Sequence, residues 1–205
     1  MKLALTLEEL RRRFAAAGPA AETLYGDEGT RPGRETLTPA SVLVPIVPRG
    51  AGLTVILTQR AAHLRDHSGQ ISFPGGRVAA GDPSPEATAL RESREEIGLD
   101  STRVELLGRL TEYRTRTGYL ITPVVGVVVP PFELRADASE VDEIFEVPLA
   151  FLLDPANHQR HSREWRGEMR SFFAMPYEGR YIWGATAGML VNLSRHLAQG
   201  SGRAR

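Results

Sequence analysis

Two neighbouring apolar runs constrain this fold more than any other feature of the sequence. Residues 41–48 read SVLVPIVP and residues 52–60 read GLTVILTQR, and both are rich in β-branched side chains. The sequence RGAG lies where the first run ends and the second begins, which predicts that the two runs pair as a hairpin of strands. The chain has 205 residues, enough for one substantial core and few for two, so we expect a single domain built on this sheet.

Further strands and helices follow without regular alternation. The apolar patterns predict strands at residues 104–113 and 120–129, a strand that turns into a short helix at 143–153, and a hairpin at 169–184. Helices are predicted at 7–16, 85–97 and 185–198. A doubly wound fold would alternate its elements strictly, so we predict instead an α/β/α sandwich, with helices on both faces of a mixed central sheet.

The sequence divides into three parts. Thr6 followed by Glu9 resembles a capping box, which favours a short N-terminal helix. Residues 17–38 are rich in Gly, Pro, Glu and Thr, a composition typical of a linker. We therefore assign residues 1–37 to an N-terminal helix and linker, 38–197 to the domain, and 198–205 to a disordered tail.

Charge and composition exclude several classes of partner. Lys plus Arg and Asp plus Glu both number 25, so no overall field would attract nucleic acid or an anionic membrane, and any polyanionic ligand must be bound by a local cluster of charges. The absence of cysteine excludes disulfides, thiolate zinc sites and cysteine nucleophiles. Because Glu8 interrupts any signal-peptide core and no apolar segment is long enough to span a bilayer, we expect a cytoplasmic protein. The oligomeric state stays open.

A cluster of carboxylates lies on the helix predicted at 85–97. On a helix, Glu92, Glu95 and Glu96 occupy positions i, i+3 and i+4, so their side chains share one face and repel one another. A solvated face laced with ion pairs is the usual explanation of such a charge run. Here the loop FPGG lies just upstream, and its glycines allow the backbone to approach a ligand closely. We therefore predict that a hard divalent cation neutralises the carboxylates, because oxygen ligands suit Mg²⁺ or Mn²⁺.

Residues Gly76 to Leu99 resemble the signature of the Nudix hydrolases, G-x5-E-x7-R-E-U-x-E-E-x-G-U, where U is aliphatic. The closing half reads RESREEIGL at 91–99 and departs from the pattern only at Ser93, which stands at an aliphatic position. The early acid is Asp82, and eight residues rather than seven separate it from Arg91. This motif is a specific signal for the family.

A second signature resembles the coenzyme A pyrophosphatase branch of that family. The branch carries L-T-x-R and then L-R-x-H-x-G-Q-I-S-F-P-G-G, and this sequence reads LTQR at 57–60 and LRDHSGQISFPGG at 64–76. The variant early acid, Asp82, resembles the same branch. Weaker similarity extends over residues 38–197. The resemblance implies a Nudix-like α/β/α sandwich.

The resemblance also implies an activity. Enzymes of this branch hydrolyse the pyrophosphate bond of a small-molecule substrate, coenzyme A or one of its derivatives. The products are 3′,5′-ADP and 4′-phosphopantetheine or its acylated or oxidised form. The cofactor is Mg²⁺ or Mn²⁺. It implies a metal site made of the residues Glu92, Glu95, Glu96 and the carbonyl of Gly75. Among the catalytic residues, Glu95 and Glu96 would act with the metal, and Arg91 would orient the acids from the same helix.

The remaining site residues are assigned with alternatives. Glu140, with Glu143 behind it, is the candidate general base, and both could equally be surface carboxylates. Arg60 and Arg65 are expected to contact the substrate together with Gly75 and Gly76, although the arginines could instead brace their loop. His63 and His67 lack a third partner for zinc and are read as loop residues. The aromatic residues Phe172, Phe173, Tyr181 and Trp183 are read as core.

Three other functions are weighed against this one. A Nudix hydrolase acting on ADP-ribose, NADH or a dinucleoside polyphosphate is disfavoured by the upstream signature. A non-catalytic nucleotide-sensing module is disfavoured because all three carboxylates are present. A Nudix-fold isomerase of isoprenoid diphosphates would need a cysteine, and this chain has none.

Overall fold

The computed structural model describes residues 5–18, 24–25, 36–64, 67–115, 117–165 and 168–202. The helices are α1 (Leu7–Ala17), α2 (Pro85–Ile97), α3 (Leu149–Leu153) and α4 (Ala185–Gly202), with short 3₁₀ turns at Ser101–Arg103 and Pro155–Asn157. The strands are β1 (Leu24–Tyr25), β2 (Thr38–Arg49), β3 (Gly52–Arg60), β4 (Ile71–Ser72), β5 (Gly75–Arg77), β6 (Val104–Arg109), β7 (Tyr113–Arg114), β8 (Tyr119–Val128), β9 (Val141–Pro148), β10 (Gln159–Trp165), β11 (Glu168–Tyr177) and β12 (Arg180–Trp183).

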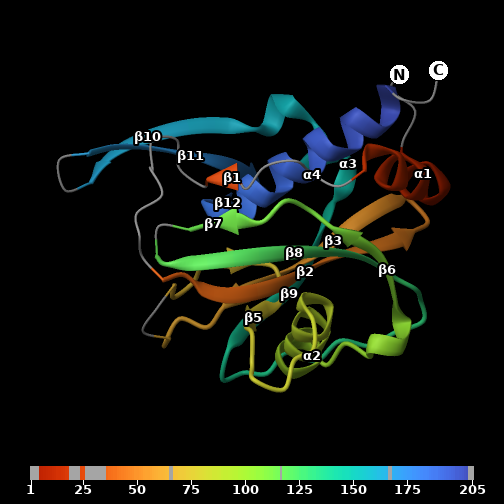
Figure 1. Ribbon diagram of the computed structural model, residues 1–205, viewed down its shortest axis with the longest axis horizontal. Coiled ribbons are helices and arrows are strands. Elements are labelled where there is room, and N and C mark those ends of the chain that lie inside the picture. Colours follow the sequence, from red (N-terminus) through yellow and green to blue (C-terminus); the bar gives the residue numbers. More distant parts are fainter. Residues whose placement is uncertain are drawn as a thin grey trace.

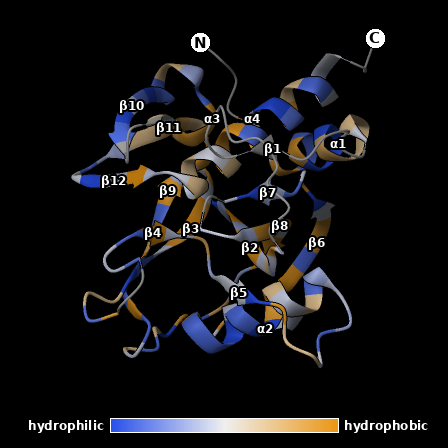
Figure 2. Cartoon of the chain, turned by 60° about the vertical axis from the view of Figure 1, so that its left-hand side comes forward, coloured by the Kyte–Doolittle hydropathy of each residue, from blue (hydrophilic) through white to orange (hydrophobic). Residues whose placement is uncertain are grey.

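A mixed sheet with β2 and β3 at its centre confirms the predicted fold class. β2 pairs antiparallel with β3 and parallel with β8, so the predicted hairpin forms the middle of the sheet. Along β2, Val42, Val44 and Ile46 face the core under α1, α3 and α4, while Leu43 and Val47 face α2. Figure 1 shows α2 on one side of the sheet and α1, α3 and α4 on the other. In Figure 2 the strands of this sheet carry many of the hydrophobic residues, whereas α2 is mostly hydrophilic.

A smaller antiparallel sheet, β10–β11–β12, stands beside the large one (Figure 1). The predicted hairpin at 169–184 is its β11–β12 pair. Its third strand, β10, was not predicted, because QRHSREW shows no alternation of apolar side chains. The prediction that all four aromatics of this region are core is wrong for Tyr181 and Trp183, which are exposed, and for Phe172, which is half-buried outside the core cluster; Phe173 does pack against the core.

The two ends of the chain differ in part from the predicted boundaries. α4 continues to Gly202, so the disordered tail predicted for 198–205 is wrong over its first five residues, and 203–205 lie outside the described residues. The N-terminal helix forms as predicted, with the Thr6 hydroxyl accepting from the Glu9 N–H at 3.2 Å. Most of the predicted linker, 19–23 and 26–35, lies outside the described residues.

α1 docks against the C-terminal half of α4, and glycine makes the approach possible. Phe14 lies against His196 with ring centroids 4.6 Å apart, and a Cβ atom at Gly200 would overlap the backbone carbonyl of Arg13. We expect Gly200→Ala to lower the free energy of unfolding by about 1–3 kcal/mol, because the backbone of α1 must move away. Gly202→Ala is the matched control, since a Cβ there meets nothing within 4 Å. Urea denaturation measures both, and equal stability of the two variants would contradict this packing.

Candidate active site

Local signals fix the helix that carries the acids. The Ser84 hydroxyl accepts from the Ala87 N–H at 3.2 Å, Pro85 begins α2, and Gly98 ends it in the left-handed conformation. Ser93 is buried against the sheet, where its hydroxyl donates to the Ala89 carbonyl at 2.7 Å. This internal hydrogen bond explains how a serine is accommodated at a position where the signature has an aliphatic residue.

Arg91 is the centre of the polar network on α2. Its guanidinium donates to both oxygens of Asp82, at 3.0 and 2.9 Å, and to the Arg77 carbonyl at 3.1 Å. Its Nη1 lies 2.8 Å from a Glu92 oxygen and 2.9 Å from a Glu95 oxygen. The hydrogen bond from Arg91 holds the pKa of Asp82 well below its usual range. Asp82 therefore anchors Arg91 despite its shorter side chain and the extra residue between them, and Arg91 in turn positions two of the acids.

Glu96 is the buried acid of the group. Its side chain is 4 % exposed, accepts from the Gly75 N–H at 3.0 Å, and lies 3.8 Å from Nη1 of Arg60. Burial raises the pKa of Glu96 to about 7, and the charges of Glu140 and Glu92 add to the rise, while the Gly75 N–H and Arg60 oppose it. The hydrogen bond from Gly75 and the positive charge of Arg60 do not offset the effect of burial on the pKa of this carboxylate.

Glu92 lies against the glycine loop, and Glu95 lies on the outside. A Cβ atom at Gly76 would come within 2.5 Å of the Glu92 carboxylate, so only glycine leaves room for it there. Burial also raises the pKa of Glu92, although Arg91 opposes the rise. The Glu95 side chain is 58 % exposed and is held by Arg91. The three acids thus share one helix face, as predicted, with different degrees of burial.

These donors fit a divalent cation, although they are not drawn together around one point. Across the described residues, no three side chains of His, Cys, Asp or Glu lie close enough to form a ready-made metal site. Burial raises the pKa of two of these carboxylates, so a nearby positive charge would stabilise their ionised form. An all-oxygen donor set also suits a hard cation. Of the three acids, Glu95 is the most exposed, and its carboxylate is paired with Arg91.

The pKa of Glu96 predicts an unusual dependence of stability on pH. The folded chain binds a proton at Glu96 more tightly than the unfolded chain, so this contribution is full below pH 4.5 and is lost as the pH rises through about 7. With a chelator present, Glu96→Gln should exceed the wild type in free energy of unfolding by about 2–3 kcal/mol at pH 8, and the excess should vanish near pH 4. Glu95→Gln is the exposed control. Urea denaturation at several pH values measures the effect, and parallel curves for wild type and Glu96→Gln would count against it.

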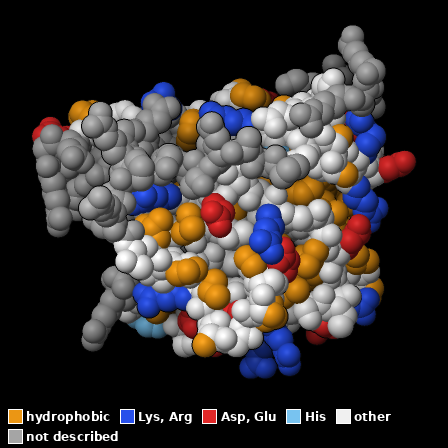
Figure 3. Space-filling model, in the orientation of Figure 1, with side chains coloured by type: hydrophobic (Ala, Val, Ile, Leu, Met, Phe, Trp, Pro, Cys, Tyr) orange, Lys and Arg blue, Asp and Glu red, His pale blue; other side chains and the backbone are white. Residues whose placement is uncertain are grey.

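A cleft of about 810 Å³ opens beside the acids. It brings together most of the predicted site residues, namely Arg60, Gly75, Gly76, Glu92, Glu96 and Glu140. The predicted residue Arg65 lies outside the described residues. Figure 3 shows acidic, basic and hydrophobic side chains interspersed on one face of the molecule.

The charged and histidine residues in and around the cleft have different partners. Within the described part of the chain, the buried Nε of Arg60 has no hydrogen-bond partner. Such a free donor is expected where an anionic ligand binds. Glu143 pairs with Arg180 on β12, which leaves Glu140 as the candidate base that lines the cleft. His63 contacts the Ser139 carbonyl at 3.1 Å, in the segment before β9, and His67 contacts Gln70 of its own loop at 2.8 Å, so both histidines have polar partners.

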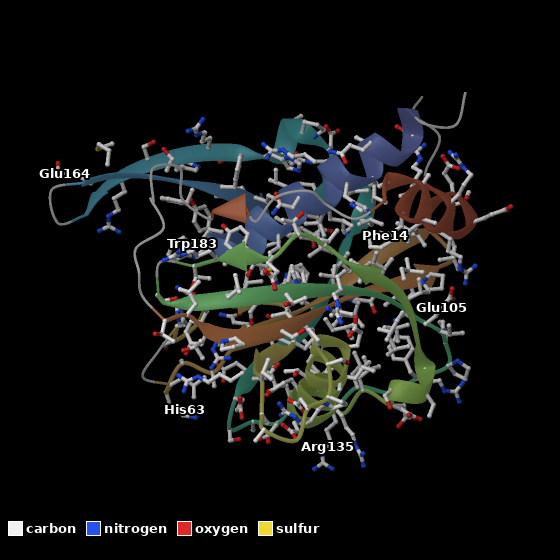
Figure 4. The ribbon with its side chains drawn as sticks, viewed as in Figure 1. Phe14, His63, Glu105, Arg135, Glu164 and Trp183 are labelled. Carbon is white, nitrogen blue, oxygen red and sulfur yellow. The ribbon has the colours of Figure 1, made fainter. Side chains whose placement is uncertain are left out.

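Several residues of the cleft were missed by sequence reasoning. Arg77 and Tyr119 form one wall, where the guanidinium donates to the Tyr119 hydroxyl at 2.6 Å and lies over its ring. Phe172 and Trp183 form another, and Figure 4 labels Trp183, the last residue of β12. The position of Arg77 directly after the glycine loop was an available signal. The two aromatics come from a distant hairpin, and no local pattern places them at the cleft.

Comparisons with known proteins find similar sequences and structures. Residues 37–166 match the NUDIX domain. Two relatives, each described as an uncharacterized Nudix hydrolase NudL, come from Escherichia coli strain K12 and Shigella boydii serotype 18; each is 39 % identical over 193 residues, covering 93 % of this chain and 94 % of the relative. Among solved structures, the Nudix hydrolase RenU of M. smegmatis aligns with a TM-score of 0.47 and 20 % identity over 60 % of this chain and 78 % of that one.

The family match and the relatives identify the chain as a hydrolase of pyrophosphate bonds. The chain belongs to the Nudix family. It is a Nudix hydrolase that acts on a nucleoside diphosphate derivative, and enzymes of this family generally use divalent metal ions. Among the described helices, none is long and apolar enough to cross a membrane.

Proposed function

We propose that this enzyme hydrolyses the pyrophosphate bond of coenzyme A or one of its derivatives. The observation that carries the proposal is the position of the second signature. Residues 70–76 of that signature, except Pro74, line the same cleft as Glu92 and Glu96, and so do Arg60 and His67. The segment that sets this chain apart from a generic Nudix sequence therefore lies where a substrate would be held.

Each predicted site residue has a role in this proposal. Glu92, Glu95, Glu96 and the Gly75 carbonyl would hold Mg²⁺ or Mn²⁺, and the bound ion would supply positive charge beside the diphosphate and lower the pKa of a coordinated water. Arg91 is a positioning residue, because it contacts the acids and not the cleft. Arg60 donates to a substrate oxygen through its unpartnered Nε, and Arg65, which lies outside the described residues, is proposed as a second arginine for a substrate phosphate.

The bond changes balance without a further reactant. Water oxygen attacks one phosphorus, the bridging P–O bond breaks, and the proton leaves to Glu140, which faces the cleft together with Glu92 and Glu96. The products are 3′,5′-ADP and 4′-phosphopantetheine, the latter acylated or oxidised if the substrate was.

A substrate panel tests the proposal. The full chain is incubated with Mg²⁺ or Mn²⁺ and with coenzyme A, its disulfide, an acyl derivative, ADP-ribose or NADH, and the products are identified by mass. We expect 3′,5′-ADP from a coenzyme A species at a higher kcat/KM than any product from the other compounds. Faster cleavage of ADP-ribose or NADH would leave the family assignment intact and overturn this choice of substrate.

A further inference from the structure

The small sheet β10–β12 has two different faces. Phe173, Met175 and Ile182 pack toward the main core. On the opposite face, the pairing of His161 with Phe172 and of Ala174 with Trp183 places His161, Phe172 and Trp183 on one side, because alternate residues of a strand share a face. This side of the sheet therefore carries aromatic rings that the core does not use.

The aromatic rings on this face are arranged for contact. Phe172 and Trp183 meet edge to face with centroids 5.5 Å apart, and His161 stacks on Phe172 at 5.8 Å with an interplanar angle of 22°. Trp183 is 39 % exposed, a large apolar surface for a side chain to leave open to water. Because Trp183 also lines the cleft, its side chain is accessible to a ligand there.

The aromatic face is continuous with the carboxylate site. Phe172, Trp183 and Arg163 line the same cleft as Glu92 and Glu96. Both β11 and β12 lie beyond residues 37–166, the segment that matches the NUDIX domain. The cleft thus combines a family element that handles the diphosphate with an aromatic wall supplied by the C-terminal part of this chain.

We propose that Phe172 and Trp183 form a stacking wall for the heteroaromatic base of the substrate, with Arg163 beside them for the phosphate on the ribose. This inference rests on the proposed function for the identity of the base, which would be adenine. A nucleotide joins its base to the diphosphate through one ribose, so a single ligand can occupy both regions of the cleft. Rings stack on ring faces, and an arginine suits a phosphate, whereas the flexible pantetheine arm offers neither partner.

Calorimetric binding of the two products tests, without any turnover, whether the wall contacts the adenine nucleotide or the pantetheine arm. The full chain is titrated, in the presence of Mg²⁺, with 3′,5′-ADP and separately with 4′-phosphopantetheine. We expect Trp183→Leu to weaken binding of 3′,5′-ADP by about tenfold to a hundredfold and to leave binding of 4′-phosphopantetheine unchanged. Trp183→Phe should recover most of the affinity, because it restores a ring to the wall.

Tyr181→Leu is the matched control. Tyr181 lies on the same face of β12 with a similar exposure, 44 %, and is not among the described residues that line the cleft, so its replacement should change neither affinity. Four results would overturn the inference. Trp183→Leu could bind 3′,5′-ADP as tightly as the wild type, or lose affinity for 4′-phosphopantetheine alone. The two leucine variants could lose affinity equally, or the wild type could fail to bind 3′,5′-ADP. If the substrate panel shows no hydrolysis of coenzyme A while Trp183→Leu still weakens 3′,5′-ADP, the proposed function fails and the stacking wall stands.

Discussion

Glu96→Gln is expected to lower kcat for the coenzyme A substrate by about a thousandfold, which corresponds to several kcal/mol of transition-state stabilisation. The amide keeps the size of the side chain and its contact with the Gly75 N–H through the remaining oxygen. It removes the negative charge from the most buried of the three acids, the charge that a cation would share. The loss should therefore appear in the chemical step and not in folding.

The measurement is a steady-state assay with products identified by mass, together with thermal unfolding of each variant. Glu105→Gln is the control, because this carboxylate on β6 pairs with Arg11 and is not among the described residues that line the cleft. It should retain wild-type kcat. A Glu96→Gln variant that turns over at a rate close to that of the wild type would remove Glu96 from the catalytic step.

Alanine at the two adjacent glycines of the loop should give opposite results. Gly75 has a φ of 157°, and a Cβ there would lie 2.6 Å from the Val42 Cα and overlap the Ser41 carbonyl, so Gly75→Ala must displace the backbone of β2. We expect it to lower the free energy of unfolding by about 2–4 kcal/mol. At Gly76 the new Cβ would meet the far end of Glu92, a flexible side chain that can move. Gly76→Ala should lose less than about 1 kcal/mol of stability.

Activity separates the two variants further. Because Gly76→Ala pushes the Glu92 carboxylate from its place, we expect kcat to fall by about a hundredfold in a chain that is still folded. Urea denaturation and the product assay, performed on both variants, measure the pair of effects. Full activity in Gly76→Ala would show that the position of Glu92 against the loop has no part in the reaction.

The helices and central strands could be predicted because their signals are local. Ser84, Pro85 and Gly98 each act within one turn of α2, and its observed bounds, Pro85–Ile97, match the predicted ones. The β2–β3 pair follows from two apolar runs and a short turn. β10 could not be predicted, since its polar sequence forms a strand only by pairing with β11. The tail was misjudged because the contact that orders Gly200 comes from α1, far away in the sequence.

The candidate site was predictable only where one element carries it. Helical spacing alone places Glu92, Glu95 and Glu96 on one face. Their different burial depends on the loop at Gly75 and on the sheet behind it, which spacing does not reveal. Trp183 lines the same cleft only because of how a hairpin distant in sequence packs against the sheet. The sequence pattern therefore predicted a core position for Trp183 instead. The roles of Arg65 and Glu140 remain predictions.

Titration of Mn²⁺ into the wild type and into Glu96→Gln at pH 8, followed by calorimetry, tests most directly whether the acidic face of α2 holds a divalent ion. Wild type should bind Mn²⁺ at least about tenfold more tightly than the variant, since a lost charge-assisted contact costs more than about 1.4 kcal/mol. Equal affinity in the two proteins would contradict the account.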